Sequence, residues 1–376
     1  PDAEIPLRLE GRGYAYRAEA AALLEGWFEH PDSSEVRGWE PYGGSTPILS
    51  LEDLQAQEMS VRDKVAQLMV PQHYDPDIDS LVARDHVGGV IVMVSTKAEV
   101  DSLLPRLKAS AQIPLFVCID AEWGAAMRLK QDYRRLPKAA YIKSDEQAYE
   151  VGLAIGAQLQ ELGIHANLAP DADVNTNPDN PVIGTRSFGA EPQLVAERAS
   201  AYARGQREAG IASCAKHFPG HGDTSVDSHL ALPVLEHSRE RLDSVELLPF
   251  RRLIGEGIEM VMTGHLGVPA IDPAGMPASI SRPINRFLRD SLGFRGVIVT
   301  DGMGMKGVTD IFGGDQVAAC VAAYSAGADL ILALKQTVEV IDAITAKVES
   351  GEFPMEELDA KVYRVLRLKQ SLGLLQ

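Results

Sequence analysis

The stretch GVIVT, at residues 296–300, shows the pattern that decides the fold. It is rich in β-branched side chains and lacks the alternation of apolar and polar residues, which is typical of a strand covered on both faces in a parallel sheet. Asp301 follows it directly, in a turn rich in glycine. The sequence therefore predicts a buried strand that delivers a carboxylate into a turn with room beside it.

Seven further short apolar runs resemble this one, and longer helical patterns separate them. These runs are AQLMV (66–70), GGVIVMV (88–94), PLFVCI (114–119), IHANLA (164–169), IASCA (211–215), EMVMT (259–263) and DLILAL (329–334). Strands that alternate with helices indicate βαβ units and a parallel sheet. With eight candidate strands, the simplest closure is a (β/α)8 TIM-type barrel, an α/β fold.

Local signals mark the ends of several helices. Ser60 is suited to cap the N-terminus of a helix that begins at VRDKVA. Four helical segments end in a glycine of the kind found beyond helix C-termini, at residues 147–163, 194–210, 315–327 and 337–351. Residues 1–55 differ in composition, being rich in Pro, Gly, acidic and aromatic residues. We expect an N-terminal extension there and a single catalytic barrel domain over residues 56–376.

Composition excludes several classes of function. The chain has 376 residues and a net charge of −17, which argues against nucleic acid and anionic membranes as partners. We expect no membrane insertion, because no apolar run is long enough to span a bilayer. The three cysteines lie in apolar surroundings and are expected to be buried thiols. A cytoplasmic location is favoured, and a secreted or periplasmic one stays open because the chain starts at Pro1.

Polar residues stand at the ends of the predicted strands. Those at or just beyond a strand end are Asp120, Asp171, Asp173, Lys216, His217, His265 and Asp301. In a barrel the C-terminal ends of the strands converge on one mouth, where the active site lies. We therefore expect residues that are far apart in the sequence to form one site.

Asp301 is the best candidate for a nucleophile, and the alternative is an aspartate that caps the next helix. Gly302, Gly304 and Gly307 also satisfy the GxGxxG pattern after a strand. A dinucleotide site is disfavoured, because Asp301 would repel the pyrophosphate and the match falls on the seventh strand instead of the first.

The stretch KHFPGHGDTSVDSH, at residues 216–229, is the second polar cluster and is expected to form a loop that leaves a strand. His217, His221, Asp223 and His229 could bind a metal, but Pro219 and Gly220 prevent the helical spacing of helix-borne zinc sites. Alternatively, Asp227 and His229 form a dyad in which the aspartate orients the imidazole, which can then act as acid and base. Surface histidines on a polar loop are the third possibility.

Two arginines also lie near the expected mouth. Arg128 follows Asp120 in DAEWGAAMR, and Arg186 lies in NPVIGTRSFG. Either could be a simple ion-pair partner or could hold hydroxyl and carbonyl oxygens of a ligand. Trp123 could stack on a sugar or pack in the interior.

Four of these stretches together resemble glycoside hydrolase family 3, in its bacterial β-N-acetylglucosaminidase (β-hexosaminidase) branch. They are DAEWG from Asp120, LAPDADVNTNPDNPVIGTRSFG from Leu168, KHFPGHGDTSVDSHLALP from Lys216 and VIVTDGMGMKGV from Val297. The resemblance runs from about Ser60 to the C-terminus. It departs from the family pattern at two positions. Trp123 stands where a second glycine beside Gly124 is usual, and Gly302 stands where an acidic or small residue is common.

The resemblance implies a retaining hydrolase without metal or organic cofactor. Matched by position, Asp301 would be the nucleophile, and His229, paired with Asp227, would be the acid/base. Substrate-binding residues would be Asp120, Arg128, Arg186, Lys216 and His217. The implied substrate is a terminal non-reducing GlcNAc on peptidoglycan fragments or chito-oligosaccharides. A phosphorylase that uses phosphate as acceptor, a metal-dependent hydrolase and a non-catalytic sugar-binding barrel stay open as alternatives.

Overall fold

The computed structural model describes residues 59–228 and 230–375. The predicted extension at residues 1–55 and the domain boundary after it lie outside the described residues and stay predictions. His229 also lies outside them.

Eight strands are found in the described part of the chain, and each overlaps one of the eight predicted runs. They are β1 (Met69–Val70), β2 (Gly89–Val92), β3 (Phe116–Ile119), β4 (Ala166–Asn167), β5 (Ala212–Phe218), β6 (Met260–Thr263), β7 (Val297–Thr300) and β8 (Ile331–Leu332). All pairings between them are parallel. The predicted α/β class with a parallel sheet is therefore confirmed.

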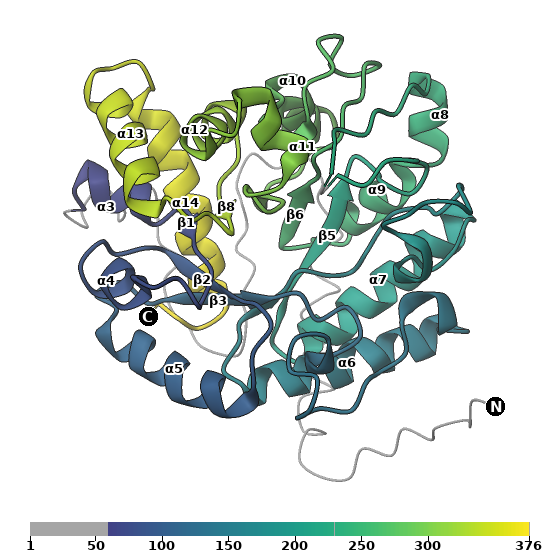
Figure 1. Ribbon diagram of the computed structural model, residues 1–376. Helices are drawn as coiled ribbons and strands as arrows, with labels where there is room; N and C mark the ends of the chain where they lie inside the picture. Colours follow the sequence, from purple (N-terminus) through teal and green to yellow (C-terminus); the bar gives the residue numbers. More distant parts are fainter. Residues whose placement is uncertain (1–58, 229, 376) are drawn as a thin grey trace. The chain divides into compact units, whose positions relative to one another are not determined.

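The strands follow each other around a curled sheet in the order of the sequence (Figure 1). Strands β2 to β7 form one six-stranded sheet, and β1 pairs with β8 in a separate two-stranded sheet. Single backbone bridges join Gln72 to Ile91 and Val299 to Leu330. The observed architecture is thus a curled, TIM-like parallel sheet.

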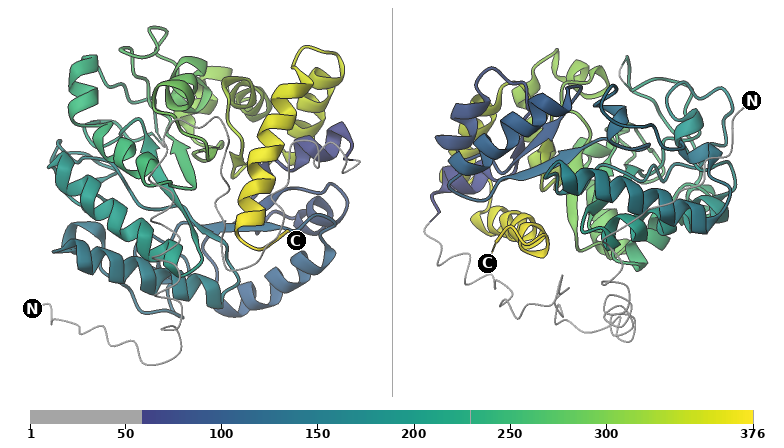
Figure 2. Two further views of the ribbon diagram at one scale, coloured as in Figure 1. Left: turned by 180° about the vertical axis from the view of Figure 1, so that it is seen from behind. Right: turned by 90° about the horizontal axis from the view of Figure 1, so that it is seen from below.

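Helices lie around the outside of this sheet (Figures 1 and 2). The α-helices are α3 (Val61–Ala66), α4 (Ile78–Ala83), α5 (Lys97–Ser110), α6 (Asp145–Glu161), α7 (Pro192–Glu208), α8 (Arg239–Ser244), α9 (Leu248–Gly255), α10 (Arg282–Arg286), α11 (Lys306–Thr309), α12 (Gln316–Ala326), α13 (Thr337–Glu349) and α14 (Met355–Ser371). The described residues contain no helix with the length and apolarity that a membrane span requires.

The predicted helix ends are confirmed. The Ser60 side chain accepts a hydrogen bond from the backbone N–H of Asp63, as an N-cap does. The four glycines expected beyond helix C-termini, at positions 163, 210, 327 and 351, all have positive φ, a conformation that glycine adopts without a steric penalty.

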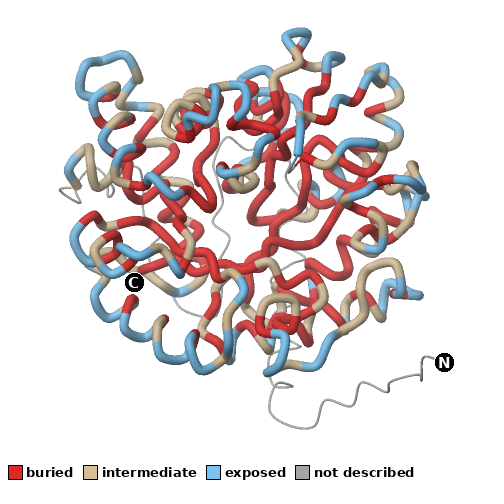
Figure 3. The backbone as a smooth tube through the Cα atoms, in the orientation of Figure 1, coloured by how far each residue is buried: buried red, intermediate tan, exposed pale blue. Residues whose placement is uncertain are grey.

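The core lies between the strands and the helices. Every residue of the strands is buried, whereas exposed residues lie on the outer helices and the loops (Figure 3). Cys118, Cys214 and Cys320 are buried free thiols, as expected from their apolar neighbours. Because both faces of these strands are covered, their sequences do not alternate between apolar and polar residues.

One strand end differs from the prediction. IASCA was expected to end β5 at Ala215, with Lys216 and His217 at or beyond its end in a polar loop. The strand continues to Phe218, and its register against β6 shifts between Ala215 and Phe218. Lys216 and His217 therefore lie within a buried strand. The polar residues Lys216 and His217 were a misleading signal for the strand end, because carboxylates that follow β3 and β4 pair with them in the interior.

Candidate active site

Asp120 lies at the C-terminal end of β3 between two cations. Lys216 Nζ lies 2.8 Å from its Oδ1, and an Nη of Arg128 lies 2.6 Å from its Oδ2. Burial would raise the pKa of Asp120, but the two cations lower it below its ordinary value. Asp120 is therefore ionised at neutral pH, and three predicted substrate-binding residues are in direct contact.

Glu122, two residues further on, extends this row of charges. Arg186 binds its carboxylate in a bidentate manner at 2.9 and 2.8 Å, and Lys216 Nζ lies 2.8 Å from its Oε1. Burial would raise the pKa of Glu122, whereas Arg186 and Lys216 hold it far below its usual range. Sequence reasoning gave Glu122 no role. The available signal was its place two residues after Asp120, in the turn just beyond the same strand end.

Lys216 joins the two carboxylates. Its side chain is only 2 % exposed, so burial would lower its pKa, but Asp120 and Glu122 raise the pKa above the ordinary value. The order Arg128, Asp120, Lys216, Glu122, Arg186 is thus an alternating row of charges, which we call the ionic row. Neighbours of opposite sign favour the charged forms of Asp120, Lys216, Glu122 and Arg186.

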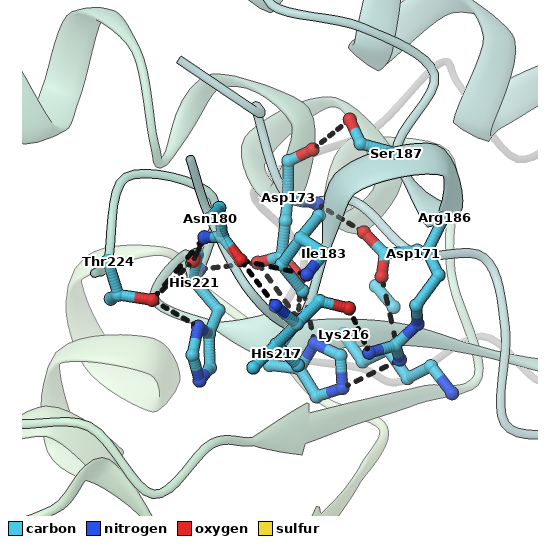
Figure 4. A network of polar contacts seen from close by, with 12 residues as sticks. Asp171, Asp173, Asn180, Ile183, Arg186, Ser187, Lys216, His217, His221 and Thr224 are labelled. Carbon is cyan, nitrogen blue, oxygen red and sulfur yellow. Dashed lines mark hydrogen bonds and ion pairs between the residues drawn. The ribbon is translucent and has the colours of Figure 1, made fainter. Parts of the chain in front are cut away.

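His217 lies beside the ionic row and is held by Asp173 (Figure 4). Its Nδ1 is 2.8 Å from Asp173 Oδ2, and its Nε2 is 3.3 Å from an Nη of Arg186. Burial, together with the charge of Arg186, lowers the pKa of His217 to about 4. The imidazole is therefore neutral at physiological pH, which suits hydrogen bonding better than proton donation.

Asp171 and Asp173 follow β4 and lie deeper. Burial and the neighbouring Asp173 raise the pKa of Asp171 well above its ordinary value, although Arg186 and His217 lower it. Ligand atoms of Asp171, Asp173 and His217 lie within 4.8 Å of one another, which is close enough for a metal. However, Asp173 already accepts hydrogen bonds from the backbone N–H groups of His217 and His221 (Figure 4). This cluster is a hydrogen-bond network that fixes His217.

Asp301 directly follows β7. The backbone N–H of Gly302 donates to its Oδ1 at 2.7 Å, and its own N–H donates to Thr263 O. Burial would raise the pKa of Asp301, but His265, His217, this N–H group and Lys216 lower it to about 2. Asp301 is therefore an ionised carboxylate beside groups of the ionic row, as a nucleophile requires.

His265, beyond the end of β6, supports the turn that carries Asp301. Its Nδ1 lies 2.7 Å from Ser279 Oγ, and its Nε2 lies 3.0 Å from Gly302 O. The sequence predicted that His265 lies just beyond a strand end, but it assigned no function to this residue. Its contacts depend on two distant segments, so no local pattern could have predicted them.

The segment after β5 lies against the loop that follows β4. Asn180 Nδ2 donates to His221 O at 2.8 Å, and Asn177 Nδ2 donates to Thr224 O at 3.1 Å. Further along, Gly307 N donates to Ser228 O at 3.0 Å, which joins this segment to the turn after β7. Asp227 is thus brought to the side of the site that carries Asp301. The predicted dyad with His229 stays a prediction, because His229 lies outside the described residues.

The predicted metal site made of His217, His221, Asp223 and His229 is not supported by the three described members. His217 contacts Asp173, His221 Nδ1 lies 2.7 Å from Thr224 Oγ1, and Asp223 contacts His237. The three side chains have separate partners. The rings of His217 and His221 pack edge to face with their centroids 5.9 Å apart, whereas Asp223 pairs with His237 instead.

A curled parallel sheet with ionised residues gathered at its C-terminal strand ends defines an α/β protein of the TIM-like class, with a candidate active site at that edge. The chain belongs to glycosyl hydrolase family 3, since the family's N-terminal domain matches residues 60–368. The resemblance seen in the sequence is therefore confirmed.

Individual relatives agree with this assignment. The chain is 34 % identical to beta-hexosaminidase A of Pseudoalteromonas piscicida, over 79 % of this chain and 55 % of that protein. It is 35 % identical to beta-hexosaminidase LpqI of Mycobacterium tuberculosis, over 83 % of each. The structure of a family 3 beta-N-acetylglucosaminidase from Paenibacillus sp. superposes with a TM-score of 0.79 and 40 % identity, over 84 % of this chain and 63 % of that one. The chain thus spans less than two thirds of the first and third of these relatives.

Proposed function

We propose that this protein is a retaining exo-β-N-acetylglucosaminidase that removes terminal non-reducing GlcNAc from peptidoglycan fragments or chito-oligosaccharides. The observation that carries the proposal is the ionised Asp301 beside the ionic row. A nucleophilic carboxylate must be deprotonated, and the pKa of Asp301, about 2, keeps it so throughout the neutral range.

The sugar is held by the ionic row. Asp120 accepts hydrogen bonds from sugar hydroxyls, while Arg128, Arg186 and Lys216 hold the carboxylates in place and donate to sugar oxygens. Neutral His217 donates or accepts without changing charge. Such charge-assisted hydrogen bonds fix the orientation of a polar ligand more strongly than neutral ones.

The reaction then has two steps. An oxygen of Asp301 attacks the anomeric carbon, the bond to the leaving-group oxygen breaks, and His229 gives that oxygen its proton. Water next loses a proton to His229 and attacks the anomeric carbon, which releases Asp301 and GlcNAc with retained β configuration. Asp227 orients His229 and stabilises its protonated form.

The relatives support the substrate class. Two of them are named beta-hexosaminidases, and the Paenibacillus structure is described as a beta-N-acetylglucosaminidase. We also propose that β1 and β8 complete a closed eight-stranded barrel. The bridges from Gln72 to Ile91 and from Val299 to Leu330 support this closure.

Product analysis tests the proposed function. Hydrolysis of nitrophenyl β-GlcNAc, followed by NMR, should give the β-anomer of GlcNAc first, and activity should survive EDTA. Initial release of the α-anomer would contradict the retaining mechanism. GlcNAc-1-phosphate as the sole product in phosphate buffer would instead establish a phosphorylase, and loss of activity with EDTA would favour a metal-dependent hydrolase.

A further inference from the structure

A second cluster of ligand-type side chains lies beside the candidate active site. Ligand atoms of Asp223, His237 and Glu246 all lie within 4.8 Å of one another. Asp223 belongs to the segment after β5, His237 lies just before α8, and Glu246 lies between α8 and α9. The cluster therefore joins the segment that leads to Asp227 to a separate part of the scaffold.

Asp223 and His237 are already in contact. His237 Nε2 lies 2.7 Å from Asp223 Oδ2, and both side chains keep some exposure, 27 % and 21 %. Around a tetrahedral zinc ion, with bonds of about 2.0 Å, neighbouring ligand atoms lie about 3.3 Å apart. The pair would need to spread only slightly to accept an ion, and its exposed side offers an entry path.

Glu246 has a buried carboxylate oxygen that could bind a cation. Its side chain is 1 % exposed, and its buried Oε2 has no hydrogen-bond partner. Burial raises the pKa of Glu246 above its ordinary value even though Arg241 lowers it. A buried carboxylate oxygen without a partner is costly, and a cation would remove that cost.

Arg241 is the cation already present. Its Nη2 lies 3.0 Å from Glu246 Oε1, 3.5 Å from Asp223 Oδ2 and 3.3 Å from Thr176 Oγ1, and its side chain is 36 % exposed. One guanidinium faces the two carboxylates of Asp223 and Glu246, so it can balance the charge of only one of them. Arg241 can keep Glu246 Oε1 while Oε2 takes a metal.

We propose that Asp223, His237 and Glu246 form a binding site for a divalent cation of the zinc class. One imidazole and two carboxylates are ligands that zinc accepts, with water in the fourth position, whereas magnesium prefers oxygen ligands alone. The network of Asp171, Asp173 and His217 differs, because there Asp173 also accepts hydrogen bonds from two backbone N–H groups and Arg186 lies 3.7 Å from Asp171 Oδ2. A bound ion would fix Asp223 to the α8–α9 region independently of catalysis.

Calorimetric titration of the chelator-treated full chain with ZnCl₂ tests the proposal. We expect binding of one zinc ion that is weakened by about tenfold or more in His237→Gln and in Glu246→Gln, since each removes a ligand. Glu236→Gln is the matched control, because Glu236 is exposed next to His237, and it should bind like the wild type. Circular dichroism checks folding, and His237→Gln decides the result if Glu246→Gln does not fold.

Two outcomes would overturn the proposal. One is the absence of zinc binding, or binding that His237→Gln leaves unchanged. The other is binding that Asp227→Asn abolishes and His237→Gln does not, which would place the ion at the predicted catalytic dyad. The readout is the affinity for zinc alone, so it does not depend on the glycosidase activity.

Discussion

At the scale of single residues, the environment of Asp301 explains how a buried carboxylate can stay reactive. Burial opposes its ionisation, and the surrounding His265, His217 and Lys216 reverse that effect. His217 is neutral, with a pKa of about 4, so it cannot serve as the proton donor at neutral pH. Another group must therefore supply the proton, and the proposed acid/base is His229.

Substitution of the two proposed catalytic groups should give different patterns. Asp301→Ala should lower kcat by at least about 10³-fold with every substrate, because the nucleophile is lost. His229→Ala should lose much less with a nitrophenyl glycoside, whose leaving group needs no proton, than with chitobiose. Steady-state kinetics with both substrates measure this, and equal losses for His229→Ala would show that the acid/base is misassigned.

Glu122 is the residue whose importance the structure adds. Glu122→Gln would leave Arg186 and Lys216 buried with too little negative charge, and should lower the free energy of unfolding by about 3 kcal/mol. It should also raise KM, since both cations lose their orientation. The matched control is Glu161→Gln, which removes an exposed ion pair with Lys97 and should change stability by less than about 0.5 kcal/mol. Urea unfolding that gave similar values for both would contradict the role of the ionic row.

At the scale of elements, β5 and the segment after it organise the site. The strand carries Lys216 and His217 into the interior, and the following segment lies against the loop after β4. Gly222 makes this contact possible, because a Cβ atom there would lie 2.0 Å from Val174 O. The position of Asp227 therefore depends on a close approach of two backbones.

Gly222→Ala should displace this segment. A shift of about 1 Å in a catalytic group can lower kcat by about 10²-fold, with the fold retained. Gly255→Ala is the control, since a Cβ atom at position 255 would meet nothing within 4 Å. Kinetics and circular dichroism on both variants measure the effect, and wild-type activity in Gly222→Ala would mean that the segment is not held as described.

The elements differ in how far the sequence predicts them. Strands such as β2 and β7 are continuous apolar runs, so composition alone identifies them. The end of β5 was misplaced, because Lys216 and His217 are polar and only their tertiary partners, Asp120 and Asp173, allow them to be buried. Local patterns cannot show partners that lie 96 and 44 residues away in the chain.

At the scale of the whole molecule, parallel strands bring distant residues to one edge of the sheet. Asp120, Lys216 and Asp301 were predicted to meet because each stands near a strand end, and the ionic row joins the first two directly. The individual partners, such as Arg186 with Glu122, could not be predicted, since side-chain geometry decides between several nearby charges. The sequence thus predicted which strand ends meet, and the packing determined the contacts between their side chains.

The buried Lys369 makes stability depend on pH. Burial lowers its pKa to about 7, and its Nζ donates to Gln67 Oε1 at 2.7 Å. The folded state loses this proton at lower pH than the unfolded state, so the unfolded state binds more protons between about pH 7 and about pH 10. The contribution of Lys369 to the free energy of unfolding therefore rises with pH in that window. Below the window both states carry the proton, and the full cost of burying the charged amine destabilises the fold.

Lys369→Met should abolish this contribution. The unfolding free energy of the wild type minus that of the variant should increase by up to about 1.4 kcal/mol per pH unit across the window. Urea unfolding in a series of buffers measures the slope. Lys335→Met, at an exposed position, is the control and should show no such slope. A constant difference between wild type and Lys369→Met would mean that Lys369 keeps its proton in the folded protein.

The most direct test of the proposed function is covalent trapping with a fluorinated GlcNAc donor, followed by digestion and peptide mass spectrometry. The donor forms the glycosyl-enzyme intermediate quickly and releases it slowly. We predict one added sugar on the peptide that contains Asp301, and no label in Asp301→Ala. A label on another residue, or no label in an enzyme that turns over GlcNAc glycosides, would contradict Asp301 as the nucleophile.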